Sequence, residues 1–393
     1  MRRTIVHAHA AEENLGDRLI VDAIRGALRA RLPQHELEFI DALPGNAANA
    51  LALDRPSDPS IQRAIDRADL VVIGGGELVG AYRGYLGLGL VASASGVPTV
   101  WLGVGGRIPD GRVDQIHARF ALKRAEVIVT RDAASYADLV REVPGVRVHD
   151  GVDVAFGWRP ELRADRGEAP EFGVCLRGPE RSDRPWDRAA FVRLARQIEV
   201  LAKRGLRPVF FTFLNERDAR RVGSPNLRGS FSSDAAVHDL MRDEIPDVAS
   251  DLLVAEGNLT RVTQRLQGLR FMLGMRLHAL ILSTHCAVPF IALDYAPKVV
   301  EFADLVGARE WVVRPDEIDS HLPALAARLC DPGERARQAT RLVTATAALR
   351  ERAMAQLELV APLLEAPRSR RRRPLARATT RAWLRVAELH ARL

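Results

Sequence analysis

Cysteine is scarce in this sequence. The three cysteines, Cys175, Cys286 and Cys330, are widely spaced and form no Cys-x-x-Cys pair. An odd number of isolated cysteines argues against a disulfide framework and a structural zinc site, and is typical of a reducing compartment. Neither a His-x-x-x-His pattern nor a carboxylate cluster suited to magnesium stands out, so we expect no metal site.

Long hydrophobic runs are also missing. A membrane-spanning helix needs about eighteen or more apolar residues. The longest candidate, Leu86 to Ala94, is interrupted by Ser93 and followed by Ser95 and Gly96. The start of the chain, Thr4-Ile-Val-His7, reaches a histidine after two apolar residues, which indicates a first strand and not a signal peptide. We therefore expect a cytoplasmic protein.

Excess positive charge is confined to one end of the chain. Nine arginines and one glutamate lie between Arg368 and Leu393, a local net charge of +8, whereas the whole chain carries +7. The other 367 residues therefore sum to −1. The arginine run raises nucleic-acid binding as one interpretation, but the nearly neutral remainder contains no recognisable module for it.

Two α/β domains are predicted, because 393 residues exceed one typical core. Buried strand patterns alternate with amphipathic helix patterns on both sides of a charged linker at Arg159 to Pro170, which favours parallel sheets. We place the domains at residues 1–160 and 170–366, followed by a basic tail at 367–393. The expected strands are 4–7, 37–41, 69–73, 98–102, 127–129, 172–176, 208–213, 252–254, 271–273, 289–293 and 311–313.

The stretch from Arg270 to Lys298 has the pattern of a strand–helix–strand unit. Phe271 to Leu273 is a short apolar run ended by Gly274, and leucines at helical spacing follow. A second buried strand comes at Pro289 to Leu293. Such a unit predicts a parallel sheet with a right-handed crossover.

Arg276 and His278 fall where the first of these strands gives way to the helix. In an open α/β sheet this edge binds ligands, and free helix N–H groups favour an anion there. Arg276 adds a permanent forked cation, and His278 adds a proton that is exchangeable near neutral pH. Lys298 follows the second strand at the same edge, and it is one of only three lysines against 54 arginines.

Two further turns follow strands of the first domain. Gly74-Gly75-Gly76 permits close approach of a ligand or of a neighbouring helix. It is not a dinucleotide fingerprint, since it follows the third strand and no acidic strand end lies about twenty residues further on. Asp17, in Asn14-Leu-Gly-Asp17, suits the N-cap of the next helix. Two interpretations of this turn remain open: it caps the helix only, or it caps the helix and also lines a binding site.

These motifs together carry a family resemblance. Gly274-Met-Arg-Leu-His278, followed by Val288-Pro289 and Tyr295-Ala-Pro-Lys298, resembles the C-terminal signature of the polysaccharide pyruvyl transferases. Asn14-Leu-Gly-Asp17 resembles the Asn-x-Gly-Asp turn of that family, and the family has a glycine-rich turn where Gly74 to Gly76 stand. Thr130-Arg131-Asp132 with Ser135 is similar to its Arg-Asp-x-x-Ser turn, in which Asp132 or Thr130 would cap a helix.

The resemblance implies a GT-B-like architecture, in which two Rossmann-like domains face each other across a cleft. The acceptor would lie on the N-terminal side and phosphoenolpyruvate on the C-terminal side. The implied reaction transfers the pyruvyl group of phosphoenolpyruvate to sugar hydroxyls of a polysaccharide or of its lipid-linked precursor, giving a pyruvate ketal. Phosphoenolpyruvate is the donor substrate, and no cofactor is implied.

The roles of individual residues also follow from the resemblance. His278 would be the general acid that protonates the methylene of the donor. The residues that would bind the anionic donor are Arg276, Leu277, Arg177 and Lys298, since guanidinium groups pair bidentately with carboxylate and phosphate. The residues that would bind the acceptor are Asn14, Gly16, Asp17, Gly75 and Gly76.

The tail has the pattern of an amphipathic basic helix. Its apolar residues recur at helical spacing, and Arg377, Arg381 and Arg385 take another face. Such a helix suits an anionic membrane surface and would fit an acceptor presented on a lipid carrier. A plain solvated end is the alternative.

A nucleotide-sugar-dependent GT-B glycosyltransferase is the alternative function. The two donor-site glutamates of such enzymes lie one residue closer together than Glu301 and Glu310, and Arg276 and His278 would have no obvious role. The sequence leaves open the acceptor sugar and its hydroxyls, ketal or enol ether product, the general base and the oligomeric state.

Overall fold

The computed structural model describes residues 1–10, 14–43, 51–53, 58–80, 83–108, 111–162, 169–178, 186–214, 234–254 and 258–365. The chain divides into two compact units. The first comprises Met1–Ala11, Ile20–Trp158 and Arg350–Leu393, and the second comprises Glu12–Leu19 and Arg159–Leu349. The predicted tail at 367–393 and its helix lie outside the described residues.

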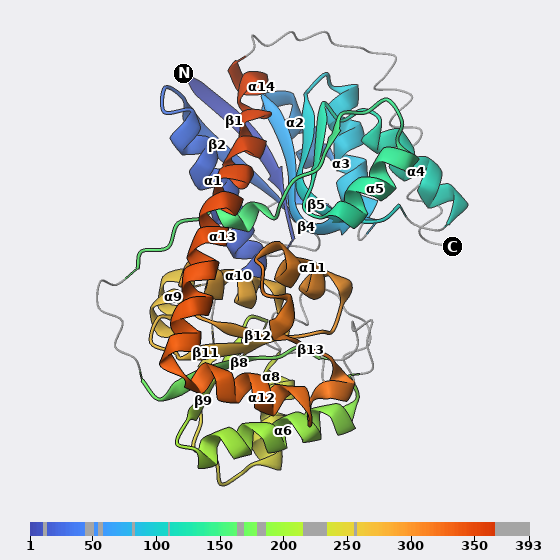
Figure 1. The fold of residues 1–393 in the computed structure, drawn as a ribbon. Coiled ribbons are helices and arrows are strands. Elements are labelled where there is room, and N and C mark those ends of the chain that lie inside the picture. Colours follow the sequence, from blue (N-terminus) through green and yellow to red (C-terminus); the bar gives the residue numbers. More distant parts are fainter. Residues whose placement is uncertain are drawn as a thin grey trace. The chain divides into compact units, whose positions relative to one another are not determined.

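The first unit is built on a seven-stranded parallel sheet of order β3-β2-β1-β4-β5-β6-β7. Its strands are β1 (Arg2–Ala8), β2 (Glu36–Leu43), β3 (Leu51–Ala52), β4 (Leu70–Val79), β5 (Thr99–Gly106), β6 (Val127–Thr130) and β7 (Val148–His149). Its helices are α1 (Leu15–Arg31, from Ile20 on), α2 (Pro59–Arg67), α3 (Arg83–Ala94), α4 (Arg112–Leu122), α5 (Ala133–Glu142) and α14 (Ala361–Glu365) (Figure 1).

Both faces of this first sheet are covered, as the continuous apolar strands predict. Val71 and Ile73 of β4 belong to a hydrophobic cluster that also contains side chains of α2, α3, α4 and α5. Ile20 and Ile24 of α1 lie against the other face, next to Gly75 and Gly74. Val71 and Ile73 of β4 therefore point to one helical layer, and Gly74 faces the other.

The second unit is built on a six-stranded parallel sheet of order β10-β9-β8-β11-β12-β13. Its strands are β8 (Glu171–Cys175), β9 (Arg207–Thr212), β10 (Asp251–Val254), β11 (Phe271–Gly274), β12 (Phe290–Leu293) and β13 (Val312–Val313). In Figure 1, α6 (Arg188–Lys203), α8 (Asp234–Glu244) and α12 (His321–Cys330) lie on one face of this sheet. The opposite face carries α9 (Leu259–Leu266), α10 (Leu277–His285) and α11 (Pro297–Leu305).

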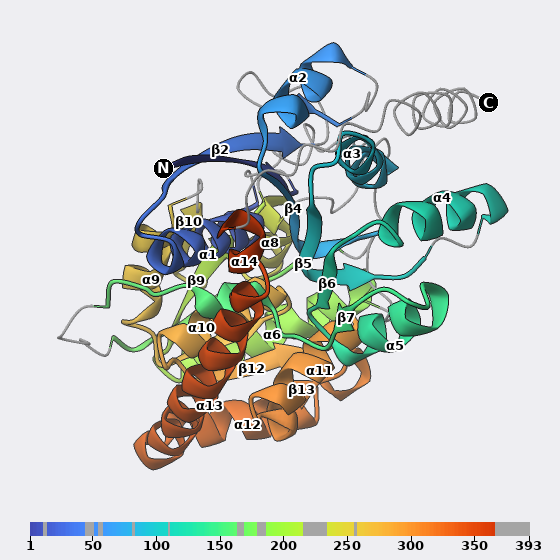
Figure 2. The ribbon, with the colours of Figure 1, turned by 90° about the horizontal axis from the view of Figure 1, so that it is seen from above.

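One long helix contributes to both units. Helix α13 (Pro332–Glu358) is continuous in both ribbon views (Figure 1 and Figure 2). Its residues up to Leu349 belong to the second unit, and those from Arg350 belong to the first. In the first unit Gln356 donates to the carbonyl of Val152 at 3.1 Å, and in the second Gln338 donates to the carbonyl of Phe290 at 3.1 Å.

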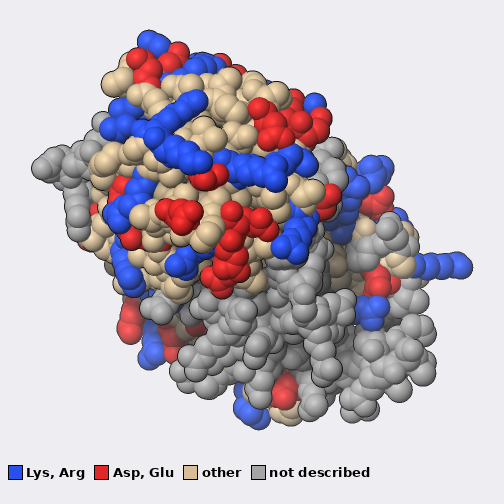
Figure 3. Space-filling view, turned by 90° about the horizontal axis from the view of Figure 1, so that it is seen from below, with Lys and Arg blue, Asp and Glu red and all other residues tan. Residues whose placement is uncertain are grey.

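Charges of both signs are interspersed on the second unit. Helix α6 lies at the lower end of Figure 1, and the view from below in Figure 3 shows rows of Lys and Arg beside groups of Asp and Glu. On this helix Arg188 pairs with Glu244, Arg193 with Asp319, and Lys203 with Glu199. This pairing agrees with the nearly neutral balance expected for the chain outside its tail.

The alternation of strands and helices is as predicted, but the short strands β3 and β7 are additional to the expected ones, and the other differences concern element ends. Strand β4 runs on to Val79, so the three glycines lie inside it and do not follow it. Glycines break a sequence pattern, but Gly76 pairs with Val104, and Glu77 with Gly105, of the equally glycine-rich β5. Helix α1 begins at Leu15, so the prediction that Asp17 is its N-cap is wrong.

Candidate functional site

The predicted donor residues follow two adjacent strands at the centre of the second sheet. Strand β8 pairs with β11, and the chain leaves these two strands toward opposite edges of the sheet. The carboxyl ends of two such strands form the crevice in which open α/β sheets bind ligands. Arg177 lies just beyond β8, and Arg276 and His278 lie just beyond β11. The topology therefore brings the predicted residues to the expected edge.

Arg276 is held by a carboxylate that the sequence motifs do not include. Its Nε donates to Asp234 Oδ1 at 2.9 Å and Oδ2 at 2.8 Å, and its Nη2 also donates to Oδ1. The Arg276 side chain is 11% exposed and that of Asp234 is 0% exposed. Burial alone would lower the pKa of Arg276, but the Asp234 carboxylate outweighs it and raises the pKa above its ordinary value. The guanidinium therefore stays charged.

Two predicted cations lie against one buried tyrosine, and the charge of a third, Arg276, also acts on it. Arg177 Nη1 donates to Tyr295 Oη at 3.2 Å, and the Arg177 guanidinium carbon lies 5.1 Å from the ring centroid. Lys298 Nζ lies 5.7 Å from the same centroid. Burial raises the pKa of Tyr295, but the charges of Lys298, Arg177 and Arg276 more than offset it, so the pKa lies below its ordinary value. This edge of the sheet is thus electropositive.

His278 lies against the turn at the start of α1. A Cβ atom placed on Gly16 would lie 2.3 Å from His278 Nδ1 and 2.6 Å from its Cγ. Asn14 Oδ1 accepts the N–H of Gly16 at 2.9 Å, as an N-cap does, and Leu15 N donates to the carbonyl of Phe213 at 3.1 Å. The turn is therefore fixed beside the imidazole.

Asp17 and Leu277 lie in the first turns of α1 and α10. Asp17 lies in the first turn of α1, where a carboxylate suits the positive end of the helix dipole. Leu277, the first residue of α10, is buried, and His278 follows it as a partly buried residue. The helix starts without a side-chain cap at Arg276, so its first N–H groups face the same edge as the cations.

The two predicted glycines, Gly75 and Gly76, belong to the first unit, whereas the predicted phosphoenolpyruvate-binding residues belong to the second. Both have a positive φ, +81° and +91°. A Cβ on Gly75 would lie 1.8 Å from Ile20 Cγ2, so close packing against α1 accounts for this glycine. Their contact with an acceptor stays a prediction.

Two residues of α8 were missed by the sequence motifs. Asp234 is the first residue of this helix, and His238 comes one turn later on the same side. His238 is fully buried, and its Nε2 accepts the N–H of Leu176 at 3.2 Å. Burial lowers the pKa of His238 to about 4, so the ring is neutral near pH 7. The four-residue spacing of Asp234 and His238 was the available signal. It predicts that the two side chains share one face of a helix, but not that they contact Arg276 and Leu176.

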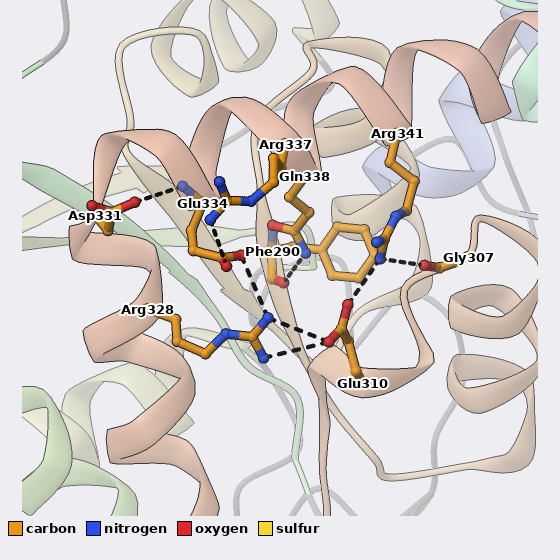
Figure 4. Close-up of polar contacts among 9 residues, drawn as sticks. All are labelled: Phe290, Gly307, Glu310, Arg328, Asp331, Glu334, Arg337, Gln338 and Arg341. Carbon is orange, nitrogen blue, oxygen red and sulfur yellow. Dashed lines mark hydrogen bonds and ion pairs between the residues drawn. The ribbon is translucent and has the colours of Figure 1, made fainter.

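The glutamate that the alternative function would need is engaged elsewhere. Glu310 accepts from Arg341 at 2.9 Å and from Arg328 at 3.3 Å, and Arg328 also pairs with Glu334 (Figure 4). These contacts, Arg341 first, lower the pKa of Glu310. Glu310 is therefore a surface ion-pair residue that joins α12 and α13 to the segment after α11.

Within the described part of the chain, no group of three or more His, Cys, Asp and Glu side chains is arranged to hold a metal ion. Among the same residues, no helix has the length and apolarity needed to cross a membrane.

Structural comparison defines the class of fold. S. aureus MnaA, in its co-structure with UDP, matches with a TM-score of 0.57 and 12% identity over 93% of this chain and 99% of that one. Anabaena Alr3699/HepE, in complex with UDP and glucose, matches with a TM-score of 0.55 and 14% identity over 92% and 99%. The UDP-GlcNAc 2-epimerase from Neisseria meningitidis, bound to UDP-GlcNAc, gives 0.53 and 13% over 92% and 100%. The chain thus has a GT-B-like α/β fold, as predicted.

Sequence comparison then defines the family. The profile of the polysaccharide pyruvyl transferases matches residues 14–297, which is more than half of the chain. The protein belongs to the polysaccharide pyruvyl transferase family, as the motifs predicted. At the level of the family it is a transferase with a saccharide acceptor. A comparison with curated proteins gives no match.

Proposed function

We propose that this protein transfers the pyruvyl group of phosphoenolpyruvate to sugar hydroxyls of a polysaccharide or of its lipid-linked precursor, forming a pyruvate ketal. The observation that carries the proposal is that Arg177 and Lys298 lie against Tyr295, and Arg276 lies just beyond β11, at the carboxyl edge of β8, β11 and β12. Phosphoenolpyruvate has two anionic groups, and three cations at one edge of the sheet suit them. No resident cofactor is required.

Arg276 is the residue best prepared to bind the donor. Its Nε and Nη2 are committed to Asp234, whereas its Nη1 donates to none of the described residues. The guanidinium therefore presents one edge in a fixed direction, and a carboxylate or phosphate oxygen accepts from it. Arg177 and Lys298 supply the second anion site, where Lys298 acts as a mobile point charge.

His278 donates the proton that starts the reaction. The proton passes from the imidazolium to the methylene carbon of phosphoenolpyruvate, which becomes a methyl group and leaves an oxocarbenium-like C2. A sugar hydroxyl attacks C2 and loses its own proton. Phosphate then leaves with its bonding electron pair, which makes C2 oxocarbenium-like again. A second hydroxyl of the sugar attacks C2 and loses its proton, which closes the ketal. Of the two protons lost by the hydroxyls, one replaces the proton given by His278 and the other leaves with the phosphate. The nearby cations stabilise the phosphate as charge develops on it.

The acceptor would lie beside the turn Asn14 to Asp17, because Gly16 touches His278 and the attacked carbon must be close to that imidazole. For Gly75 and Gly76, which belong to the first unit, acceptor binding is a proposal that rests on the family resemblance alone. A lipid-linked acceptor would bring the enzyme to a membrane surface, where the basic tail at 367–393 provides a peripheral contact.

Phosphate release tests the proposal. Purified protein with phosphoenolpyruvate and a saccharide acceptor should release inorganic phosphate and form a product whose mass is increased by the pyruvyl group. Nucleotide sugars should give no turnover. The alternative glycosyltransferase is favoured only by the UDP-bound neighbours of the fold, and turnover with a UDP-sugar in the absence of phosphoenolpyruvate would establish it instead.

A further inference from the structure

One fully buried carboxylate joins three segments of the second unit. Asp234 Oδ2 accepts the N–H groups of Phe213 at 2.8 Å and Leu214 at 3.1 Å, just beyond β9. The same carboxylate accepts from Nε and Nη2 of Arg276, just beyond β11. Phe213 in turn accepts the N–H of Leu15 at the start of α1. Asp234 thus links Arg276 to Phe213, and Phe213 is bonded to the turn at the start of α1 that lies beside His278.

These contacts keep the guanidinium of Arg276 charged and also fix its orientation. An arginine side chain has many rotamers, and a bidentate pair with a buried carboxylate selects one plane for the fork. The backbone donors at Phe213 and Leu214 hold the carboxylate itself in place. The remaining Nη1 edge is therefore aimed before any ligand arrives, which lowers the cost of ordering it during binding.

A second residue of α8, His238, makes a contact next to Arg177, the other arginine proposed to bind phosphoenolpyruvate. His238 is four residues after Asp234 and has no exposed surface. Its Nε2 accepts the N–H of Leu176, so the proton of the neutral ring is on Nδ1. Leu176 immediately precedes Arg177. One face of α8 therefore fixes the Arg276 side chain and the strand end that carries Arg177.

We propose that Asp234 and His238 are positioning residues for the donor: α8 sets the separation and direction of Arg276 and Arg177 so that both meet the same dianionic ligand. This inference rests on the proposed function. Neither residue needs to touch the ligand, and the expected signature is weakened donor binding with acceptor binding unchanged.

The first test compares Asp234→Asn with a matched control. Glu171 is another buried carboxylate of the same unit that pairs with two arginines, Arg207 and Arg265, but it begins β8 at the opposite edge of the sheet. Asp234→Asn should raise the KM for phosphoenolpyruvate by at least about tenfold, as expected when a charge-assisted contact is lost. Glu171→Gln should leave that KM within about twofold of the native value. Both variants should leave the KM for the acceptor unchanged.

The second test uses two amides at position 238. The amide oxygen of His238→Gln reaches the place of Nε2 and can accept from Leu176, whereas the shorter side chain of His238→Asn cannot. The Gln variant should keep a native KM for phosphoenolpyruvate, and the Asn variant should raise it several-fold. Equal KM values for the two variants, or a native value for Asp234→Asn, would overturn the proposal.

The Arg276 Nε–H resonance in a ¹⁵N-labelled sample gives a readout that needs no donor. In the native protein this proton should exchange slowly with water, and in Asp234→Asn it should exchange fast. Absence of phosphoenolpyruvate turnover in the native enzyme would refute the proposed function alone. Slow exchange that persists in Asp234→Asn would refute the positioning role, whichever substrate the enzyme uses.

Discussion

Gly16 and His278 are in direct contact, although 262 positions separate them in the chain. A Cβ on Gly16 would overlap the imidazole, since it would lie 2.3 Å from Nδ1. No positive φ is found at Gly16, and the three atoms nearest to such a Cβ all belong to the His278 side chain. The turn that resembles an acceptor-binding motif thus also packs against the imidazole of His278, the proposed general acid.

Replacing Gly16 should therefore disturb catalysis through His278. Gly16→Ala must push the imidazole aside, and a displacement of about 1 Å at a reacting group costs roughly a hundredfold in rate. We expect kcat/KM to fall by about that factor. Steady-state phosphate release measures it.

Gly26→Ala is the matched control for this change, because Gly26 lies in the same helix and a Cβ placed on it would have no atom within 4 Å. Its activity should be native, and its free energy of unfolding should rise by about 0.5–1 kcal/mol, as for Gly→Ala in a helix interior. Native activity in Gly16→Ala would show that the proposed acid does not depend on the position of this ring.

Tyr295→Phe tests the hydroxyl that accepts a hydrogen bond from Arg177. The ring remains, so the contact with Lys298 stays, but Arg177 loses a hydrogen-bond acceptor at the Tyr295 hydroxyl. We expect the KM for phosphoenolpyruvate to rise by about three- to tenfold, since a single hydrogen bond to a charged donor is lost. A larger fall in kcat than rise in KM would instead assign the hydroxyl to the chemical step.

Arg276→Lys tests the forked geometry and keeps the charge. A lysine carries all its N–H donors on one nitrogen, so it cannot reproduce the planar fork that binds Asp234 along one edge and presents a separate nitrogen to phosphoenolpyruvate. The KM for phosphoenolpyruvate should rise by at least about tenfold. Arg341→Lys provides the control, because Arg341 binds Glu310 and the carbonyl of Gly307 on the surface. Equal kinetics in both variants would remove Arg276 from the donor site.

His238 predicts a dependence of stability on pH. Burial lowers its pKa to about 4 from 6.5; Asp234 acts in the opposite direction, and Arg276 and Arg242 act in the same direction. Between these two values the unfolded chain binds a proton that the folded chain does not. The free energy of unfolding therefore falls as the pH falls through this window, by up to about 2 kcal/mol between pH 7 and 5.

Urea denaturation of the native protein and of His238→Gln at pH 7 and pH 5 checks this expectation. The variant should lose less stability over the interval. The other fully buried histidine with a lowered pKa, His7, contributes the same sign to both proteins, so it cancels in the comparison. An identical pH dependence would mean that His238 is protonated without cost in the folded state.

The strand and helix order was predictable because both sheets are parallel and buried on both faces. Such strands are continuous apolar runs, for example Val127–Thr130 and Phe290–Leu293, and each is followed by a helical pattern. Asp132 was predictable as a cap for the same local reason, and its side chain accepts from Ser135 N. The glycine-rich half of β4 was not predictable, since its pairing depends on the partner strand.

Only those residues of the candidate site that lie within a sequence motif were predictable. Arg276, His278 and Lys298 lie within one strand–helix–strand unit, so local spacing places them at one edge. Asp234 lies 42 positions before Arg276 and follows a polar stretch, and nothing local says that the two meet. The contact of Gly16 with His278 is likewise a product of the tertiary fold.

A crystal structure with a stable analogue of phosphoenolpyruvate tests the central claim most directly. The account predicts that the carboxylate and phosphate of the analogue contact Arg276, Arg177 and Lys298, with an imidazole nitrogen of His278 within about 3–3.5 Å of the carbon that replaces the methylene. An analogue bound elsewhere, or bound here with His278 turned away from that carbon, would contradict it.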